Sequence, residues 1–252
     1  MINNKNIAYK NYFSGKEKNL LRYGWYIEKF FKGVKKKKIL EIGCGDGGLI
    51  KILNNTNDVY GVDVSESGVR NVNSMNIECS MLDISVDELP YKNRFFDYVI
   101  ILEVVEHVKS PYFALEEIQR VLKVNGKLLI SIPNYRNGHK LLYPSLFKFW
   151  QFKHFLEHLG YNVDIVDYYG FCPPFWMIFK KIIVKINRKI QKKKDNGAGF
   201  FPSLAFITSV GFFKIIKPRI FAWSFIYMCS NKKPSRAKKL FFEIAKDTSG
   251  AY

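Results

Sequence analysis

The sequence of 252 residues is poor in cysteine and contains no long apolar run. Its four cysteines form no CxxC pair and have no zinc-ligand spacing, which argues against a zinc module or a disulfide-stapled secreted domain. We expect free buried thiols at these positions, Cys44, Cys79, Cys172 and Cys229. No stretch reaches the ~20 apolar residues that span a bilayer, and residues 1–6 lack the apolar core of a secretory signal. Both absences favour a cytoplasmic protein.

Acidic residues are also scarce, with 22 Asp and Glu against 40 Lys and Arg and a net charge of +18. Such an excess favours anionic partners, either nucleic acid or an anionic membrane surface. The charge is concentrated between Phe171 and Ile220, where eleven Lys and Arg residues face one acid, Asp195, among apolar runs. This mixture is typical of a helix lying at a membrane interface, and equally of a helical cap whose lysines are solvated. Both interpretations remain open.

The clearest local pattern is Lys38–Gly48, with the sequence KILEIGCGDGG. A short apolar run bounded by lysines and glycines predicts a buried parallel strand. The glycines allow a sharp turn and close approach of a ligand to the backbone. Apolar residues then return at helical spacing from Leu49 to Leu53. Strand, glycine loop and helix together predict a nucleotide-type binding turn.

The acids of this turn decide between ligands. Gly43, Gly45 and Gly48 fit the dinucleotide fingerprint, which alone is a weak signal. However, Glu41 and Asp46 would repel a pyrophosphate. Two carboxylates suit a ligand with an amino group, a sulfonium cation and no phosphate, which is S-adenosylmethionine (SAM).

Three later acids stand at the ends of further expected strands. Asp63 follows Val59–Val62 and can accept both ribose hydroxyls. Asp83 ends a third strand and offers an acceptor for the adenine amino group. Glu103 ends a fourth strand that starts at Phe95.

In order, the motifs EIGCGDG, FDYV, EVVEHV and RVLKVNGKLLI resemble those of class I SAM-dependent methyltransferases over roughly residues 37–135. The EVVEHV segment also resembles the polyprenyl-catechol O-methyltransferases. The resemblance implies an α/β fold with a doubly wound, Rossmann-like, seven-stranded and mostly parallel sheet. It further implies SAM as cofactor, bound by Glu41, Gly43, Cys44, Gly45, Asp46, Gly47, Asp63, Val64, Asp83, Ile84 and Glu103.

Methyl transfer requires alignment of the acceptor and, for some acceptors, removal of a proton. Glu103, Glu106 and His107 begin where the fourth strand ends, and in a helix they would share one face. We predict these three as catalytic, with His107 suited to act as a base near neutral pH. The same stretch occurs across the family with many acceptors, so a structural histidine is an equal alternative. We expect no metal site, although Glu106 and His107 could donate to a divalent ion.

Five segments are expected along the chain. Residues 1–34 form an N-terminal helical lid, with an amphipathic helix over the cofactor mouth, and residues 35–170 form the SAM-binding core. Residues 171–221 are a basic, apolar helical insertion before the last strand, beside the substrate entrance. Residues 222–232 form the closing antiparallel strand, and residues 233–252 a basic tail.

Within the core, a helix is expected to start at Ser110–Pro111 and to end at Asn125–Gly126. A strand then covers Lys127–Ile132. A helix over Ser145–Leu159 and a sixth strand over Tyr161–Tyr168 follow.

The sequence therefore predicts a SAM-dependent O-methyltransferase for a small-molecule or lipid-linked acceptor, cytoplasmic and peripheral at the inner face of the membrane. An RNA methyltransferase would also explain the charge. However, Ser131–Asn134 is not the Asn/Asp-Pro-Pro-aromatic motif of exocyclic-amine methyltransferases. A non-catalytic interaction protein with this fold is the third alternative, although the glycine loop and the ribose acid are intact.

Overall fold

The computed structural model describes residues 22–134, 142–171 and 222–232. Most of the expected lid, the expected insertion apart from its first residue, and the expected tail lie outside the described residues. Within these three ranges, no helix is both long and apolar enough to cross a membrane.

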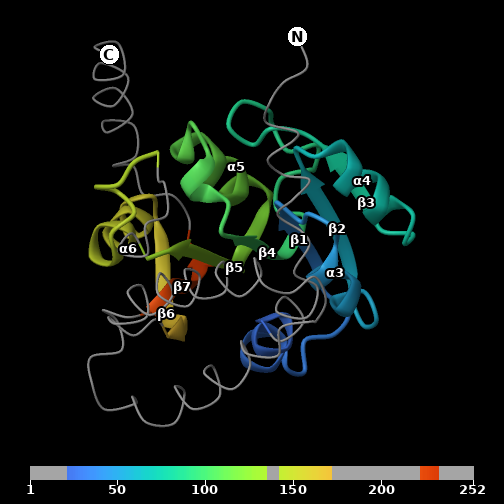
Figure 1. Ribbon diagram of the computed structural model, residues 1–252, viewed down its shortest axis with the longest axis horizontal. Helices are drawn as coiled ribbons and strands as arrows, with labels where there is room; N and C mark the ends of the chain where they lie inside the picture. The colour runs from blue at the N-terminus through green and yellow to red at the C-terminus, as the bar shows by residue number, and fades with distance from the viewer. Residues whose placement is uncertain (1–21, 135–141, 172–221, 233–252) are drawn as a thin grey trace, which may run out of the picture.

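Seven strands form one sheet in the order β3-β2-β1-β4-β5-β7-β6 (Figure 1). Their bounds are β1 Lys38–Ile42, β2 Asp58–Asp63, β3 Glu78–Met81, β4 Phe96–Leu102, β5 Leu122–Pro133, β6 Tyr161–Phe171 and β7 Ala222–Asn231. Neighbours among β1 to β5 pair in parallel, whereas β7 runs antiparallel to both β5 and β6. The expected seven-stranded, mostly parallel α/β sheet is therefore confirmed. The strand order reverses between β1 and β4, where open α/β sheets bind ligands.

Helices cover both faces of this sheet (Figure 1). Their bounds are η1 Ile27–Phe31, α3 Gly48–Leu53, α4 Glu66–Asn73, η2 Val105–His107, α5 Pro111–Val121 and α6 Phe149–His158. Alternate strand residues serve opposite faces. Leu40 packs in a core with α5 and α6, whereas its neighbour Ile39 packs with α3, α4 and η1. Burial on both faces explains why the strands are continuous apolar runs.

The helix expected to end at Asn125–Gly126 ends at Val121 instead, and β5 already begins at Leu122. The register of β5 against β4 shifts between Phe96 and Tyr98, so the Asn-Gly pair belongs to an irregularity within β5. Asn125 has φ 63, and a Cβ on Gly126 would come 2.9 Å from the Lys123 carbonyl oxygen. A left-handed residue ends a helix or forms a bulge, and the sequence alone does not separate the two.

Two later boundaries also differ from expectation. Helix α6 begins at Phe149, four residues after Ser145, and ends at His158 before Gly160, whose φ is 87. Strand β6 continues to Phe171, beyond the expected end at Tyr168.

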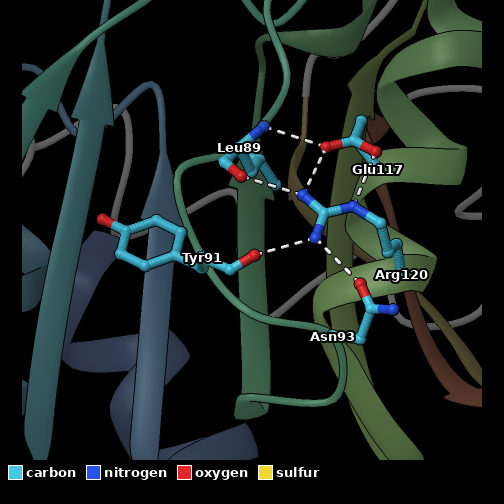
Figure 2. A network of polar contacts seen from close by, with 5 residues as sticks. All are labelled: Leu89, Tyr91, Asn93, Glu117 and Arg120. Atoms are coloured by element: carbon cyan, nitrogen blue, oxygen red, sulfur yellow. Dashed lines mark hydrogen bonds and ion pairs between the residues drawn. The ribbon is translucent and has the colours of Figure 1, made fainter.

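Arg120 fixes the loop between β3 and β4 (Figure 2). Its guanidinium donates to both Glu117 carboxylate oxygens at 2.8 and 2.7 Å. It also donates to the carbonyls of Leu89 and Tyr91, each at 2.8 Å, and to Asn93 Oδ1 at 3.0 Å. Glu117 in turn accepts the Leu89 N–H at 2.9 Å. One arginine thus satisfies the backbone of the loop that follows Asp83.

Arg120→Ala should lower the free energy of unfolding by about 2–4 kcal/mol, because it leaves carbonyls and a carboxylate without their donor. Arg70→Ala is the matched control, since Arg70 forms an exposed pair with Glu66 at 2.8 Å and should cost under about 0.5 kcal/mol. Urea denaturation of both variants measures the difference. Equal losses would show that the Arg120 network contributes no more than a surface ion pair.

Candidate functional site

The candidate site lies at the carboxyl ends of β1, β2 and β4, where the glycine loop leaves β1. Gly43, Gly45 and Gly47 have φ values of 72, 57 and 79, a region that L side chains rarely adopt. A Cβ on Gly43 would overlap Cγ2 of Val104, the residue that follows Glu103. The glycines therefore let the loop pass close against the end of β4.

Asp63 connects this loop to β2. Its two carboxylate oxygens accept the Gly45 N–H at 2.7 Å and the Ser65 N–H at 2.8 Å. Each oxygen retains a further lone pair for a ligand hydroxyl. Asp63, which is half-buried, thus shapes the loop, and its binding of a ribose stays a prediction.

The other residues predicted to contact the nucleoside follow the ends of β2 and β3. Asp83 is half-buried, and its Oδ1 accepts the Ser85 N–H at 2.9 Å. Val64 is exposed, whereas Ile84 is buried in the core. Only the main chain of Ile84 is therefore available to a ligand, since its side chain packs inward.

Glu41 and Arg22 supply opposite charges beside the loop. Glu41 is buried, and its Oε2 has no hydrogen-bond partner among the described residues. Burial raises the pKa of Glu41 to about 8, with the Ile50 N–H and Arg22 acting against the shift. The Arg22 Nε is also buried and, within the same residues, without an acceptor. A buried acceptor and a buried donor without partners indicate a zwitterionic ligand group, with an ammonium at Glu41 and a carboxylate at Arg22.

Glu103 is held at the end of β4 with φ 56. Its Oε1 accepts the Ser131 hydroxyl at 2.8 Å, and burial raises the pKa of its carboxyl. Tyr26 lies near Ser131, and it stacks on Tyr169 with ring centroids 6.2 Å apart. The sequence interpretation missed Tyr26 and Ser131. A serine inside the apolar run of β5 was the available signal.

The three predicted catalytic residues do not share a helical face. Glu103 precedes η2, a single 3₁₀ turn, instead of starting an α-helix. The Glu106 side chain is fully buried, while that of His107 is 44% exposed, although His107 Nε2 lies 3.8 Å from Glu106 Oε1. Burial and the nearby Glu103 raise the pKa of Glu106 well above its ordinary value. A shared face was expected only if the segment were α-helical. The segment forms just the three-residue 3₁₀ turn Val105–His107, so the three side chains do not follow an α-helical repeat.

The remaining loop residues have distinct positions. Asp46 is half-buried, and its carbonyl accepts the Asn71 side-chain amide at 2.9 Å. Cys44 is buried and lies 3.6 Å from Cys79, sulfur to sulfur. Among the described residues, no group of three or more His, Cys, Asp or Glu side chains could hold a metal ion.

Together these features fit SAM. The glycine loop leaves room for close approach, and Asp63 and Asp83 offer acceptors for the nucleoside. Glu41 and Arg22 match the two charged groups of the methionine part. The only negative group of SAM is its carboxylate, so Arg22 is the one cation that the ligand requires. The two acids near the loop, Glu41 and Asp46, suit the positive charge of the sulfonium.

Comparison with known proteins agrees with this fit. Residues 40–130 match the family model of a methyltransferase domain. Over 127 residues the chain is 30% identical to a ubiquinone biosynthesis O-methyltransferase of Alkalilimnicola ehrlichii, covering 48% of this chain and 51% of that protein. It is 32% identical over 99 residues to a probable S-adenosylmethionine-dependent methyltransferase of Mycobacterium tuberculosis, covering 39% of this chain and 36% of that protein. The chain thus spans about half, or less, of the curated relatives it matches.

The fold is similar to that of a SAM-dependent methyltransferase from Archaeoglobus fulgidus, with a TM-score of 0.56. That match has 18% sequence identity and covers 85% of this chain and 93% of the other. At this identity the likeness concerns the fold alone.

Proposed function

We propose that the chain transfers the methyl group of SAM to a small-molecule or lipid-linked acceptor, because residues 40–130 match the family model of a methyltransferase domain. The observation that carries the proposal is the pairing of Asp63 with the glycine loop beside the buried Glu41 and Arg22. These residues provide partners for the ribose hydroxyls and for the amino and carboxylate groups of SAM.

SAM supplies a methyl group on a sulfonium, which leaves as a neutral thioether. The protein's main task is to align the acceptor with that methyl group and to exclude water. Asp63 orients the ribose and Asp83 the adenine, while Glu41 and Arg22 hold the amino and carboxylate groups. The glycine loop fixes the distance between these contacts.

His107 is the favoured proton acceptor among the three predicted catalytic residues. The Glu106 side chain is fully buried, so it cannot meet an acceptor, and burial raises the pKa of its carboxyl well above the ordinary value. Glu103 is hydrogen-bonded to Ser131, which suits it to a positioning role. The His107 imidazole is exposed enough to meet an acceptor.

For the acceptor, we propose O-methylation at or near the inner face of a membrane. The ubiquinone biosynthesis names of several relatives support an apolar, lipid-linked acceptor. The basic and apolar composition of residues 171–220 supports contact with an anionic surface. The net charge of +18 equally favours an RNA acceptor, which is the second candidate.

Methyl-labelled SAM distinguishes these acceptors directly. The full chain is incubated with separated lipid, small-molecule and RNA fractions, and the label is followed into each. Label in the lipid or small-molecule fraction is expected. Label in RNA alone would replace the lipid proposal, and no label in any fraction would favour a non-catalytic role.

His107→Ala, tested on the labelled acceptor, should lower kcat by about 10²–10⁴-fold while SAM affinity stays near that of the unchanged protein. His154→Ala is the control, because His154 is also an exposed histidine but belongs to α6. A kcat unaltered by His107→Ala would make the histidine structural and direct attention to Glu103.

SAM affinity should rise with pH between about 6 and 8. The ligand's ammonium binds best to ionised Glu41, so binding below its pKa of about 8 must release a proton. One released proton lowers Kd by up to about tenfold per pH unit. Above this range the rise should end because Glu41 is already ionised, and the affinity should then fall as the ligand's own amino group loses its charge.

Isothermal titration calorimetry in buffers of different ionisation enthalpy measures that proton directly. Glu41→Gln should bind SAM more weakly and with little dependence on pH. Arg22, Asp46, Asp63 and Tyr23 also surround Glu41. The pKa values of Arg22 and Tyr23 are both raised above their ordinary values, so these two groups move further from this window. An affinity that is flat or falls between pH 6 and 8 would refute ionised Glu41 as the ammonium's partner.

A further inference from the structure

Two buried cysteines meet beside the glycine loop, although 35 residues separate them in the chain. Cys44 belongs to the loop and Cys79 to β3, and their sulfur atoms are 3.6 Å apart. Neither cysteine is in a disulfide. The fold thus produces a thiol pair for which the sequence gives no indication.

Gly61 of β2 makes room for this pair. Strand β2 lies between β1 and β3, and Gly61 is the registered partner of Cys79. A Cβ at Gly61 would lie 2.9 Å from Cys44 Sγ and 3.0 Å from Cys79 Sγ. Any larger residue at position 61 would therefore push the sulfur atoms away from where they meet.

We propose that Cys44 and Cys79 form an oxidation site that closes to a disulfide and thereby displaces the SAM-binding loop. The effect on SAM binding rests on the proposed function, whereas formation of the bond does not. The sulfur atoms must approach from 3.6 Å to about 2.05 Å.

Cys79 cannot easily supply that movement. Its N–H donates to Asn73 Oδ1 at 2.9 Å, and its carbonyl accepts the Asn73 side-chain amide at 3.1 Å. The loop must therefore shift toward β3. Cys44 directly precedes Gly45, whose N–H bonds Asp63 at 2.7 Å, so the shift loosens the contact that positions the ribose acid.

The chemistry needs a peroxide as oxidant. The Cys79 sulfur attacks one peroxide oxygen, the O–O bond breaks, and a sulfenic acid and water form. The Cys44 sulfur then attacks the Cys79 sulfur and expels a second water, so two electrons pass from the thiols to the peroxide. The Cys44 thiol can donate a hydrogen bond to the Cys79 sulfur, which lowers the pKa of Cys79 and favours it as the first nucleophile.

The test uses the full chain, reduced and then treated with hydrogen peroxide. Peptide mapping after alkylation of the remaining thiols should reveal a Cys44–Cys79 link, absent in Cys79→Ala. Hydrogen exchange should show faster exchange of the Gly45 amide in the oxidised protein, reversed by dithiothreitol. SAM should bind the oxidised protein about tenfold or more weakly, in keeping with a loosened hydrogen bond to a charged group.

Two variants keep the result interpretable. Cys229→Ala removes another buried free cysteine and should oxidise at the Cys44–Cys79 pair like the unchanged protein. Cys79→Ala should keep its SAM affinity after peroxide treatment. No Cys44–Cys79 link, or a linked protein with unaltered loop exchange, would overturn the proposal. Failure of the reduced protein to bind SAM would instead overturn the proposed function, while the mapping and exchange data still decide on the disulfide.

Discussion

Asp63→Ala should weaken SAM binding by about 10²–10⁴-fold. The carboxylate can form two hydrogen bonds to the ribose hydroxyls, and each bond to a charged group contributes on the order of 1.5–3 kcal/mol. The same carboxylate accepts the Gly45 N–H at 2.7 Å and the Ser65 N–H at 2.8 Å. The variant therefore loses direct contacts with the ligand and the anchor of the glycine loop together.

Asp58→Ala is a matched control on the same strand. Asp58 begins β2, whereas Asp63 ends it, and the Asp58 carboxylate forms an exposed pair with Lys38 at 3.2 Å. Its removal should leave SAM affinity unaltered. Calorimetric titration of both folded variants, with thermal melting as a check, measures the contrast.

Asp63→Asn separates the two roles of the carboxylate. The amide oxygen of the asparagine can still accept one backbone N–H, but it carries no charge. The SAM affinity of Asp63→Asn should therefore lie between those of Asp63→Ala and the unchanged protein. SAM binding by Asp63→Ala within about threefold of the unchanged protein would exclude Asp63 as the ribose acid.

The sheet and much of the site could be predicted because their signals are local. Lys38–Gly48 contains a strand, a loop and a helix start in eleven consecutive residues, and Asp63 directly ends an apolar strand. The positive φ values of Gly43, Gly45 and Gly47 are what a glycine-rich turn implies. The seven-stranded, mostly parallel arrangement came from the family resemblance, since periodicity alone does not specify which strands are neighbours.

Features that depend on the packing of distant segments could not be predicted. Tyr26 lies near Ser131, and Cys44 lies next to Cys79. The members of each pair are far apart in the sequence, so no local pattern indicates that they are close in space. Glu106 and His107 are adjacent in sequence, yet the Glu106 side chain is fully buried and that of His107 is 44% exposed. The EVVEHV segment forms only a 3₁₀ turn, so the i, i+3, i+4 rule did not apply to it.

The largest expected loss of stability comes from Gly43→Ala. Gly43 has φ 72, and a Cβ there would overlap Val104 Cγ2. The left-handed backbone costs an L residue about 1–2 kcal/mol, and overpacking against Val104 adds about 1–3 kcal/mol. A total of about 2–5 kcal/mol corresponds to a fall in Tm of about 4–20 °C for a chain of this size.

Gly33→Ala isolates the backbone part of this loss. Gly33 has φ 77, but no described atom lies within 4 Å of a Cβ built there. Gly33→Ala should therefore lower the free energy of unfolding only by the cost of the left-handed backbone, about 1–2 kcal/mol.

Val104→Ala removes the γ-carbons that the new Cβ meets, so Gly43→Ala combined with Val104→Ala should cost less stability than the sum of the two single changes. The shortfall in a double-mutant cycle, measured by urea denaturation, gives the steric part as about 1–3 kcal/mol. Strict additivity, or a loss for Gly43→Ala no greater than that for Gly33→Ala, would show that the loop can move away from β4, so that close packing is not what requires glycine at position 43.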